Sequence, residues 1–201
     1  MEHPVTTMRE LRRLSRSQRG AVVVESALIL PVFLIVIFAT MEFGLAFRTY
    51  LTMSSAARDS VRHAATMGRD PEADFQVLYE AMHTLDVVGG GNVSKIVIFK
   101  ATGPDSTTAS GALAACRTAS VTNLCNTYSG TGLQANPADF GCGPTALDRF
   151  WCPSNRKVAV SDPPDYVGIY IEVDHQGITG VIGMTRTFSD EIVMRLEPVR
   201  T

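Results

Sequence analysis

This 201-residue chain lacks a strong net charge, and it lacks the usual catalytic and metal-binding motifs. The formal net charge is −2, so no global field attracts nucleic acid or an acidic ligand. No two of its four histidines show ligand spacing such as H-x-x-x-H, and neither G-x-S-x-G nor a reactive-thiol context occurs. We therefore expect no enzyme activity, no metal, no cofactor and no nucleic-acid partner.

Charge is also almost absent from residues 21–41, where Glu25 is the one ionisable residue in 21 positions. A helix of that length rises about 30 Å, enough to cross the hydrocarbon core of a bilayer. The preceding residues 1–20 form a basic arm with five arginines against two glutamates. Such flanks stay in the cytoplasm, so we predict one transmembrane helix with the C-terminal part of the chain extracytoplasmic. A buried helix of a soluble protein is the alternative.

A small-residue cleavage site is missing after this apolar run, which continues as MEFGLAFRTYL. A secretory signal peptide requires small residues of the A-x-A type at that point. An uncleaved signal anchor is therefore favoured over a conventional signal peptide.

Cysteine is absent from the arm and the span, and all four cysteines fall in the predicted outer part. An even set in a loop-rich extracytoplasmic region predicts disulfides. Three connectivities are open, of which the sequential one closes the shortest loops. Zinc is disfavoured, because the cysteines are separated by eight and nine residues rather than two to four. The four are Cys116, Cys125, Cys142 and Cys152.

Helical spacing of apolar and small residues continues beyond the span, and no proline occurs from 32 to 70. We predict one helix from Ala21 to Met67, in which residues 42–68 form an amphipathic stalk. The small residues of this stalk are expected to pack within the chain rather than against another subunit. The predicted apolar face consists of Phe43, Phe47, Tyr50, Ser54, Ala57, Val61 and Ala64.

Residues 69–201 are predicted to form an extracytoplasmic α+β domain. Asp70 would cap a short helix ended by Gly89-Gly90-Gly91, and strands are predicted at 93–100, 166–173 and in 184–198. Residues 101–165 read as a long loop that needs disulfide stapling. Asp162 and Asp165 could coordinate calcium, although a solvated proline turn is favoured. A small antiparallel sheet packed on the stalk gives the α+β class.

The start of the span carries a more specific pattern, because Arg19-Gly20 is followed by AVVVE and Glu25 is the fifth residue after the glycine. This spacing resembles the processing site of Flp-class type IV pilin-like proteins. In that family a membrane prepilin peptidase cuts after the glycine on the cytoplasmic side. An aromatic residue often follows the glutamate there, whereas this chain has Ser26.

The longer stretch GAVVVESALILPVFLIVIFATMEFG, followed by AARDSVRHAA, resembles the N-terminal signature of TadE-like minor pseudopilins of Tad (tight-adherence) pilus systems. The resemblance covers residues 19–65 and implies a non-catalytic component of pilus assembly. Its implied partners are other pilins and pseudopilins, the inner-membrane assembly platform and a prepilin peptidase. The matching positions are Gly20-Ala21, Glu25, Pro31, Glu42-Phe43-Gly44 and Ala56-Ala57-Arg58.

The resemblance implies different roles for the two glutamates of this stretch. Gly20 and Ala21 would flank the scissile bond, and Glu25 would serve peptidase recognition and assembly. Glu42, Phe43 and Gly44 would serve packing, and Glu42 could also simply mark the outer membrane boundary. The alternative to a pilus role is an anchored extracytoplasmic binding or sensor domain, with the Gly20–Glu25 spacing a coincidence.

Overall fold

The computed structural model describes residues 8–88, 92–104, 112–159, 163–180 and 184–198. The chain divides into two units. One comprises Met1–Gly44 and Gly177–Met184, and the other comprises Leu45–Gln176 and Thr185–Thr201. The first helix contributes residues to both units.

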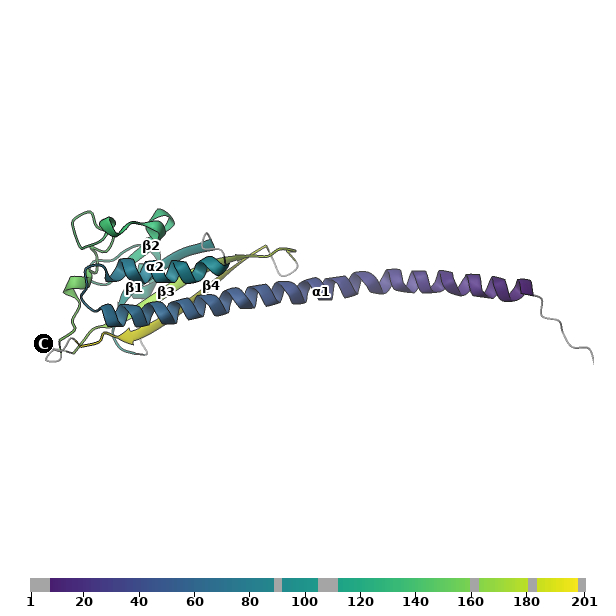
Figure 1. Cartoon of the computed structure of the whole chain (residues 1–201), viewed down its shortest axis with the longest axis horizontal. Coiled ribbons are helices and arrows are strands. Elements are labelled where there is room, and N and C mark those ends of the chain that lie inside the picture. The colour runs from purple at the N-terminus through teal and green to yellow at the C-terminus, as the bar shows by residue number, and fades with distance from the viewer. Residues whose placement is uncertain (1–7, 89–91, 105–111, 160–162, 181–183, 199–201) are drawn as a thin grey trace, which may run out of the picture. The chain divides into compact units, whose positions relative to one another are not determined.

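The elements have the α+β composition that the sequence predicts (Figure 1). A long apolar helix is followed by a short helix and a four-stranded antiparallel sheet, which confirms the predicted fold class. In chain order they are α1 (Met8–Met67), α2 (Ala73–Leu85), η1 (Asp86–Val88), β1 (Val93–Ala101), α3 (Ala112–Thr118), β2 (Cys125–Ser129), η4 (Gly130–Gln134), η5 (Pro137–Asp139), η6 (Pro153–Asn155), β3 (Tyr166–Gln176) and β4 (Thr185–Arg195).

Helix α1 begins at Met8, well before the predicted start at Ala21. The sequence MRELRRLSRSQR is rich in strong helix formers and has neither proline nor glycine, so the basic arm continues the helix. Its C-terminal end matches the prediction. Gly68 there adopts a left-handed φ of +57°, and its N–H donates to the carbonyl of Ala64 at 3.3 Å. Residues 1–7 of the arm lie outside the described residues.

The sheet has the strand order β2-β1-β3-β4, with every neighbouring pair antiparallel (Figure 1). The predicted alternation of β3 is present: its β-branched residues from Val167 to Val173 are buried on one face, together with Ile96 and Ile98 of β1. On the other face Gly168 lies opposite Phe99, whose ring covers the space that a side chain would need.

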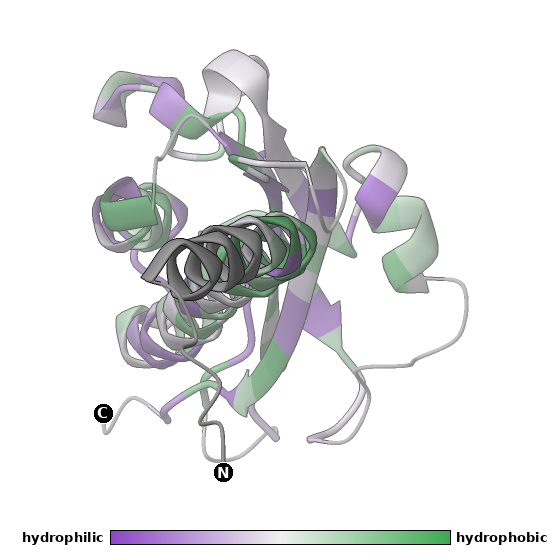
Figure 2. Cartoon of the chain, turned by 90° about the vertical axis from the view of Figure 1, so that its right-hand side faces the viewer, coloured by the Kyte–Doolittle hydropathy of each residue, from purple (hydrophilic) through white to green (hydrophobic). Residues whose placement is uncertain are grey.

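The two faces of the sheet carry different helices (Figure 2). The larger core lies between the sheet and helices α1 and α2, and a smaller cluster packs α3 against the opposite face. Small residues of α1 allow this close approach and are buried within the chain, as predicted. The buried α1 residues of this unit are Thr49, Met53, Ser54, Ala56, Ala57, Ser60, Val61, Ala64 and Ala65.

Burial along the predicted face of α1 changes at its aromatic end. Phe43, Phe47 and Tyr50 are all exposed, whereas the threonine at position 49 is buried. The buried stripe follows the small residues, which fit against the sheet, while the partly exposed ring of Tyr50 lies edge-on to Phe188 of β4, with centroids 6.1 Å apart.

The start of α2 also differs from the prediction. The carboxylate of Asp70 accepts the N–H of Glu72 at 2.8 Å, which closes a turn, and the helix begins only at Ala73. Pro71 has no N–H, and the first turn of a helix does not need one. The sequence therefore fits a helix that begins at Pro71 as well as it fits this turn. Residues 89–91, predicted to end the helix, lie outside the described residues; α2 itself ends at Leu85 and continues into η1.

The described part of the predicted loop 101–165 is more ordered than expected, because it contains α3, β2 and three short 3₁₀ turns. Disulfides join Cys116 to Cys125 and Cys142 to Cys152, with Cα–Cα distances of 6.0 and 5.3 Å. This is the sequential connectivity. The first bond ties α3 to the edge strand β2, so the cysteines fix secondary structure rather than a structureless loop. Residues 105–111 and 160–162 of this region lie outside the described residues.

Candidate processing and assembly segment

The predicted scissile bond, Gly20–Ala21, lies inside α1 rather than in a flexible leader. Both residues are exposed, and a Cβ added at Gly20 would meet nothing within 4 Å. Glycine costs about 1 kcal/mol relative to alanine in a helix interior. The bond therefore lies at a locally weak point of an otherwise strong helix.

The apolar part of α1 is exposed on every side within its unit. Within the described residues, the segment from Gly20 contains one stretch long and apolar enough to cross a membrane, and none of that stretch is buried in the protein. An all-round apolar helix requires a hydrocarbon or protein environment. Pro31 lies within this stretch, where a membrane helix tolerates it.

Glu25 lies four residues after Ala21, so the two side chains share one face of the helix. It is exposed, and within the described residues its carboxylate makes no hydrogen bond or ion pair. A lone acid costs about 2.5–3.5 kcal/mol at the centre of a membrane helix on insertion scales, and less near the interface, where Glu25 lies as the fifth residue of the span 21–41. A cation brought to this face would remove much of that cost.

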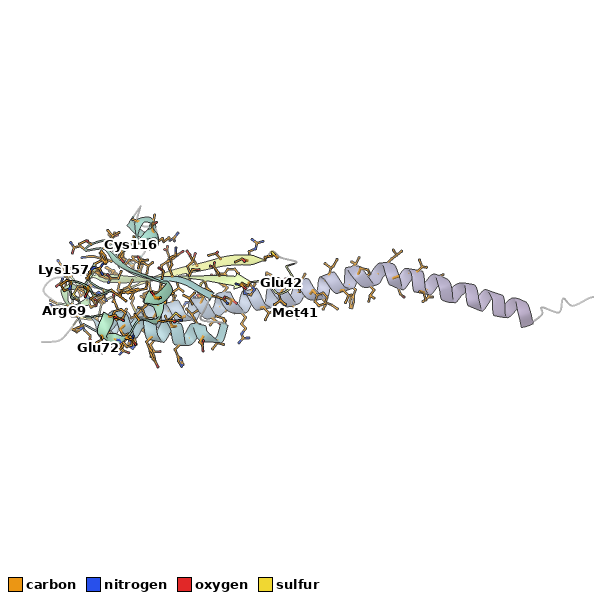
Figure 3. All side chains as sticks on the ribbon, turned by 90° about the horizontal axis from the view of Figure 1, so that it is seen from above. Met41, Glu42, Arg69, Glu72, Cys116 and Lys157 are labelled. Atoms are coloured by element: carbon orange, nitrogen blue, oxygen red, sulfur yellow. A yellow bond between two sulfur atoms is a disulfide. The ribbon has the colours of Figure 1, made fainter. Side chains whose placement is uncertain are left out.

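Glu42 has a different environment, because it is only 2% exposed. Its Oε2 accepts a hydrogen bond from the hydroxyl of Thr179, in the connection between β3 and β4. Figure 3 labels Glu42 on the long helix. Both residues belong to the same unit. The carboxylate therefore joins α1 to a segment far away in sequence. The next two residues, Phe43 and Gly44, are exposed.

The second unit contains a buried polar network that sequence inspection missed. Asp74 of α2 and Arg156 form an ion pair in which both side chains are fully buried. The Asp74 Oδ2 atom also accepts hydrogen bonds from Asn126 Nδ2 and Tyr128 Oη, each at 2.8 Å. Burial, and next the Asp74 carboxylate, raise the pKa of Tyr128 well above its usual value. The network joins α2 and β2 to the segment of η6.

Trp151 completes this network. The guanidinium of Arg156 lies over its indole ring, with Cζ 4.3 Å from the centroid. The side-chain amide of Asn126 bonds both backbone groups of Trp151, accepting from its N–H at 2.9 Å and donating to its carbonyl at 3.0 Å. A lone tryptophan beside a cysteine was a weak sequence signal, and no spacing rule pairs it with residues on α2.

The calcium hypothesis for the SDPPD stretch is not supported by the part of it that the structure describes. Asp165 forms an ion pair with Lys100 at 3.0 Å and accepts the N–H of Lys157 at 2.9 Å, so its carboxylate anchors the segment before β3. Asp162 lies outside the described residues. Within the described ranges, no three histidine, cysteine or acidic side chains group as metal ligands would.

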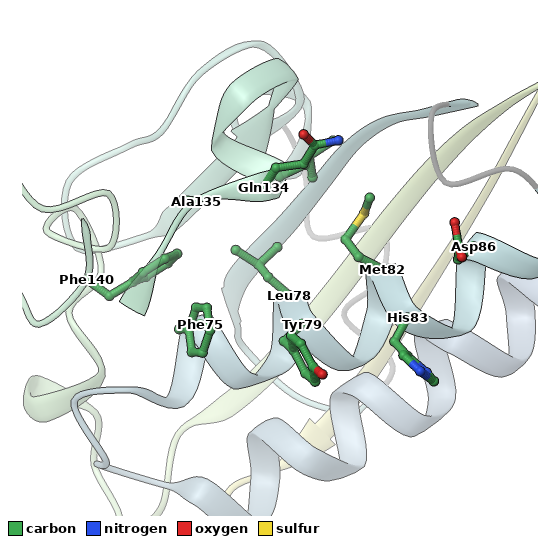
Figure 4. Close-up of a pocket in the computed structure, with 10 residues that line it drawn as sticks. Phe75, Leu78, Tyr79, Met82, His83, Asp86, Gln134, Ala135 and Phe140 are labelled. Atoms are coloured by element: carbon green, nitrogen blue, oxygen red, sulfur yellow. The ribbon is translucent and has the colours of Figure 1, made fainter. Parts of the chain in front are cut away.

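An open pocket of about 390 Å³ lies along the outer side of α2 (Figure 4). Aromatic rings from α2 and from the segment after η5 form one end, where the centroids of Phe75 and Phe140 are 5.6 Å apart. Tyr79, 56% exposed, stacks on His83 at 6.3 Å. The remaining lining residues are Leu78, Met82, Asp86, Leu133, Gln134 and Ala135.

The geometry therefore defines a class: a chain with one N-terminal helix of membrane-spanning length, followed by a disulfide-bonded α+β unit. The family model for TadE-like protein matches residues 20–62. This match begins at Gly20 and includes both glutamates, so the resemblance predicted from the N-terminal signature is confirmed over this stretch. No curated protein and no solved structure matches the chain.

Proposed function

We propose that this chain is a non-catalytic minor pseudopilin, anchored by a single membrane span and needed to assemble a Tad/Flp-type pilus or secretion apparatus. The observation that carries the proposal is the TadE-like match at residues 20–62, which spans the processing motif and both glutamates. In this proposal the N-terminal arm is cytoplasmic and residues 42–201 are extracytoplasmic. The disulfides support that orientation, because they persist in oxidising compartments.

The proposed chemistry begins with cleavage after Gly20 by a prepilin peptidase. Cleavage leaves a positively charged α-amino group on Ala21, at the start of an apolar helix. The Glu25 carboxylate of a neighbouring pilin or pseudopilin can pair with that amine, which compensates both charges. Because a lone buried charge is strongly unfavourable, such a pair also discriminates against wrong axial registers.

A complementation experiment tests this function. The chromosomal gene is deleted and then replaced by wild type, Glu25→Gln or Ser26→Ala, and surface pili are counted by electron microscopy. We expect pili to be lost on deletion, to remain absent with Glu25→Gln and to return with Ser26→Ala. Immunoblots of membranes establish that all variants are present. Normal piliation in the deletion strain would contradict the proposal.

A second candidate function is an anchored extracytoplasmic binding domain unrelated to pili. The pocket along α2 favours it, since exposed aromatic and polar side chains line a concave site. Tyr79→Ala would then abolish the phenotype of the gene while Glu25→Gln would not. The pseudopilin proposal expects the opposite order of severity.

A further inference from the structure

The connection between β3 and β4 has an unusual composition for the end of a β-hairpin. Its residues, GITGVIGM from Gly177 to Met184, include no charged side chain. Two of its large apolar side chains point away from the protein: Ile178 is 70% exposed and Met184 is 82% exposed. Hairpin ends in water are normally built from polar turn residues, so these two side chains indicate a less polar environment.

The connection is held to a defined level of α1. The Thr179 hydroxyl donates to the carboxylate of Glu42, which is the first residue after the apolar stretch 21–41. The connection is itself closed by a hydrogen bond from the N–H of Gly177 to the carbonyl of Met184 at 3.0 Å. All of these residues belong to one unit. Ile178 therefore lies next in sequence to a residue bonded at the outer end of the span.

We propose that the described ends of the connection between β3 and β4, Gly177–Gly180 and Met184, form an interfacial anchor that inserts Ile178 and Met184 into the outer leaflet of the bilayer that residues 21–41 span. Glu42 holds the connection at headgroup depth. A 21-residue helix is about as long as the hydrocarbon core is thick, so Glu42 lies where the core ends. Aliphatic side chains at that depth are stabilised by burial between the headgroups and the acyl chains, while the hydrogen bond between the Thr179 hydroxyl and the Glu42 carboxylate stays in the polar layer.

In this role the buried carboxylate of Glu42 does more than mark the outer boundary of the membrane. Glu42 would fix two separate membrane contacts of one chain, the span and the hairpin connection, at a constant spacing. The exposed ring of Phe43 is placed as an interfacial aromatic at the same level. The inference rests on the proposed membrane topology but not on cleavage or on a pilus.

Lipid quenching of tryptophan fluorescence tests the inference in the full-length protein. The protein is reconstituted in phosphatidylcholine vesicles with or without brominated acyl chains. The chain has one tryptophan, Trp151, which is buried and gives a low background. Ile178→Trp reports on the connection, Phe33→Trp on the span, and Val87→Trp, at a position 66% exposed in η1, on solvent.

We expect brominated lipid to quench the added emission of Ile178→Trp and Phe33→Trp several-fold more than that of Val87→Trp. In the Ile178→Trp background, Thr179→Val should reduce quenching, because it removes the bond to Glu42. Quenching unchanged by Thr179→Val would overturn the holding role.

Quenching of Phe33→Trp without quenching of Ile178→Trp would overturn the anchor and leave the proposed function intact. Blue-shifted but unquenched emission from Ile178→Trp would place the connection against another protein subunit, which also overturns it. If Phe33→Trp is itself unquenched, the membrane topology fails together with the anchor.

Discussion

The buried pair of Asp74 and Arg156 makes a quantitative prediction about stability. Asp74→Asn keeps the side-chain shape and acceptor capacity for Asn126 and Tyr128 but removes the charge that compensates the guanidinium. Within the described residues, Nε and Nη1 of Arg156 have no acceptor, and the remaining acceptor, the carbonyl of Trp151, is 3.4 Å from Nη2. The variant therefore leaves a buried cation almost without compensation.

Breaking a buried pair by removing one partner typically costs about 3–5 kcal/mol. For a chain of this size each kcal/mol lowers the melting temperature by about 2–4 °C, so we expect a loss of roughly 6–20 °C. Arg156→Met should cost a similar amount, because it leaves the carboxylate buried. The double variant should cost clearly less than the sum of the two, since no unpaired charge remains.

Unfolding is measured on the full-length protein in detergent micelles by the emission of Trp151, which lies directly under the Arg156 guanidinium. Lys95→Met is the matched control. Its partly exposed ion pair with Glu172, 3.3 Å long, should contribute less than about 1 kcal/mol. Additive losses in the double variant, or an Asp74→Asn protein as stable as the control, would refute the argument that the pair is held by mutual charge compensation.

Three further predictions concern the α+β unit. Gly168→Ala should destabilise the protein by about 1–3 kcal/mol, because the new Cβ would lie 2.2 Å from a ring atom of Phe99. Gly132→Ala is the control and should not destabilise it, because a Cβ there would meet nothing within 4 Å. Hydrogen bonds, first from Ser94, lower the pKa of Asp174, so its contribution to stability is present above its usual pKa and is lost as pH falls through the lowered value. Ser94→Ala should therefore flatten the acid limb of a plot of melting temperature against pH, and an unchanged limb would contradict this. Thiol alkylation of membranes without reductant should label no cysteine, while four labelled thiols in native protein would exclude both disulfides.

Much of the fold follows from periodicity in the sequence. The end of α1 and the alternation of β3 were predictable, because a glycine that ends a helix, Gly68, and a two-residue repeat are local signals. The edge strand β2 was not, since CNTYS is short and mostly polar and becomes a strand by pairing with β1. Helix α3 was missed for a related reason: it has only seven residues and is held by a disulfide to that strand.

The features of the candidate functional site were likewise predictable only where they depend on neighbouring residues in the sequence. The spacing of Gly20 and Glu25 is a local pattern and could be read directly. The burial of Glu42 could not be read, because its partner Thr179 is 137 residues away. Asp74 and Arg156 are likewise 82 residues apart, and only the packing of α2 against the disulfide-bonded region brings them together. Contacts at such separations depend on topology, which composition and periodicity do not specify.

The N-terminus of the mature protein tests the central claim most directly. The protein is purified from native membranes of cells with an active prepilin peptidase, and its N-terminal peptide is identified by mass spectrometry beside a Gly20→Ala variant. Alanine at this position removes the recognised glycine and also strengthens the helix around the bond. We predict that the wild-type chain begins at Ala21 and that Gly20→Ala retains the arm. A wild-type chain that still begins at Met1 would contradict the proposed processing.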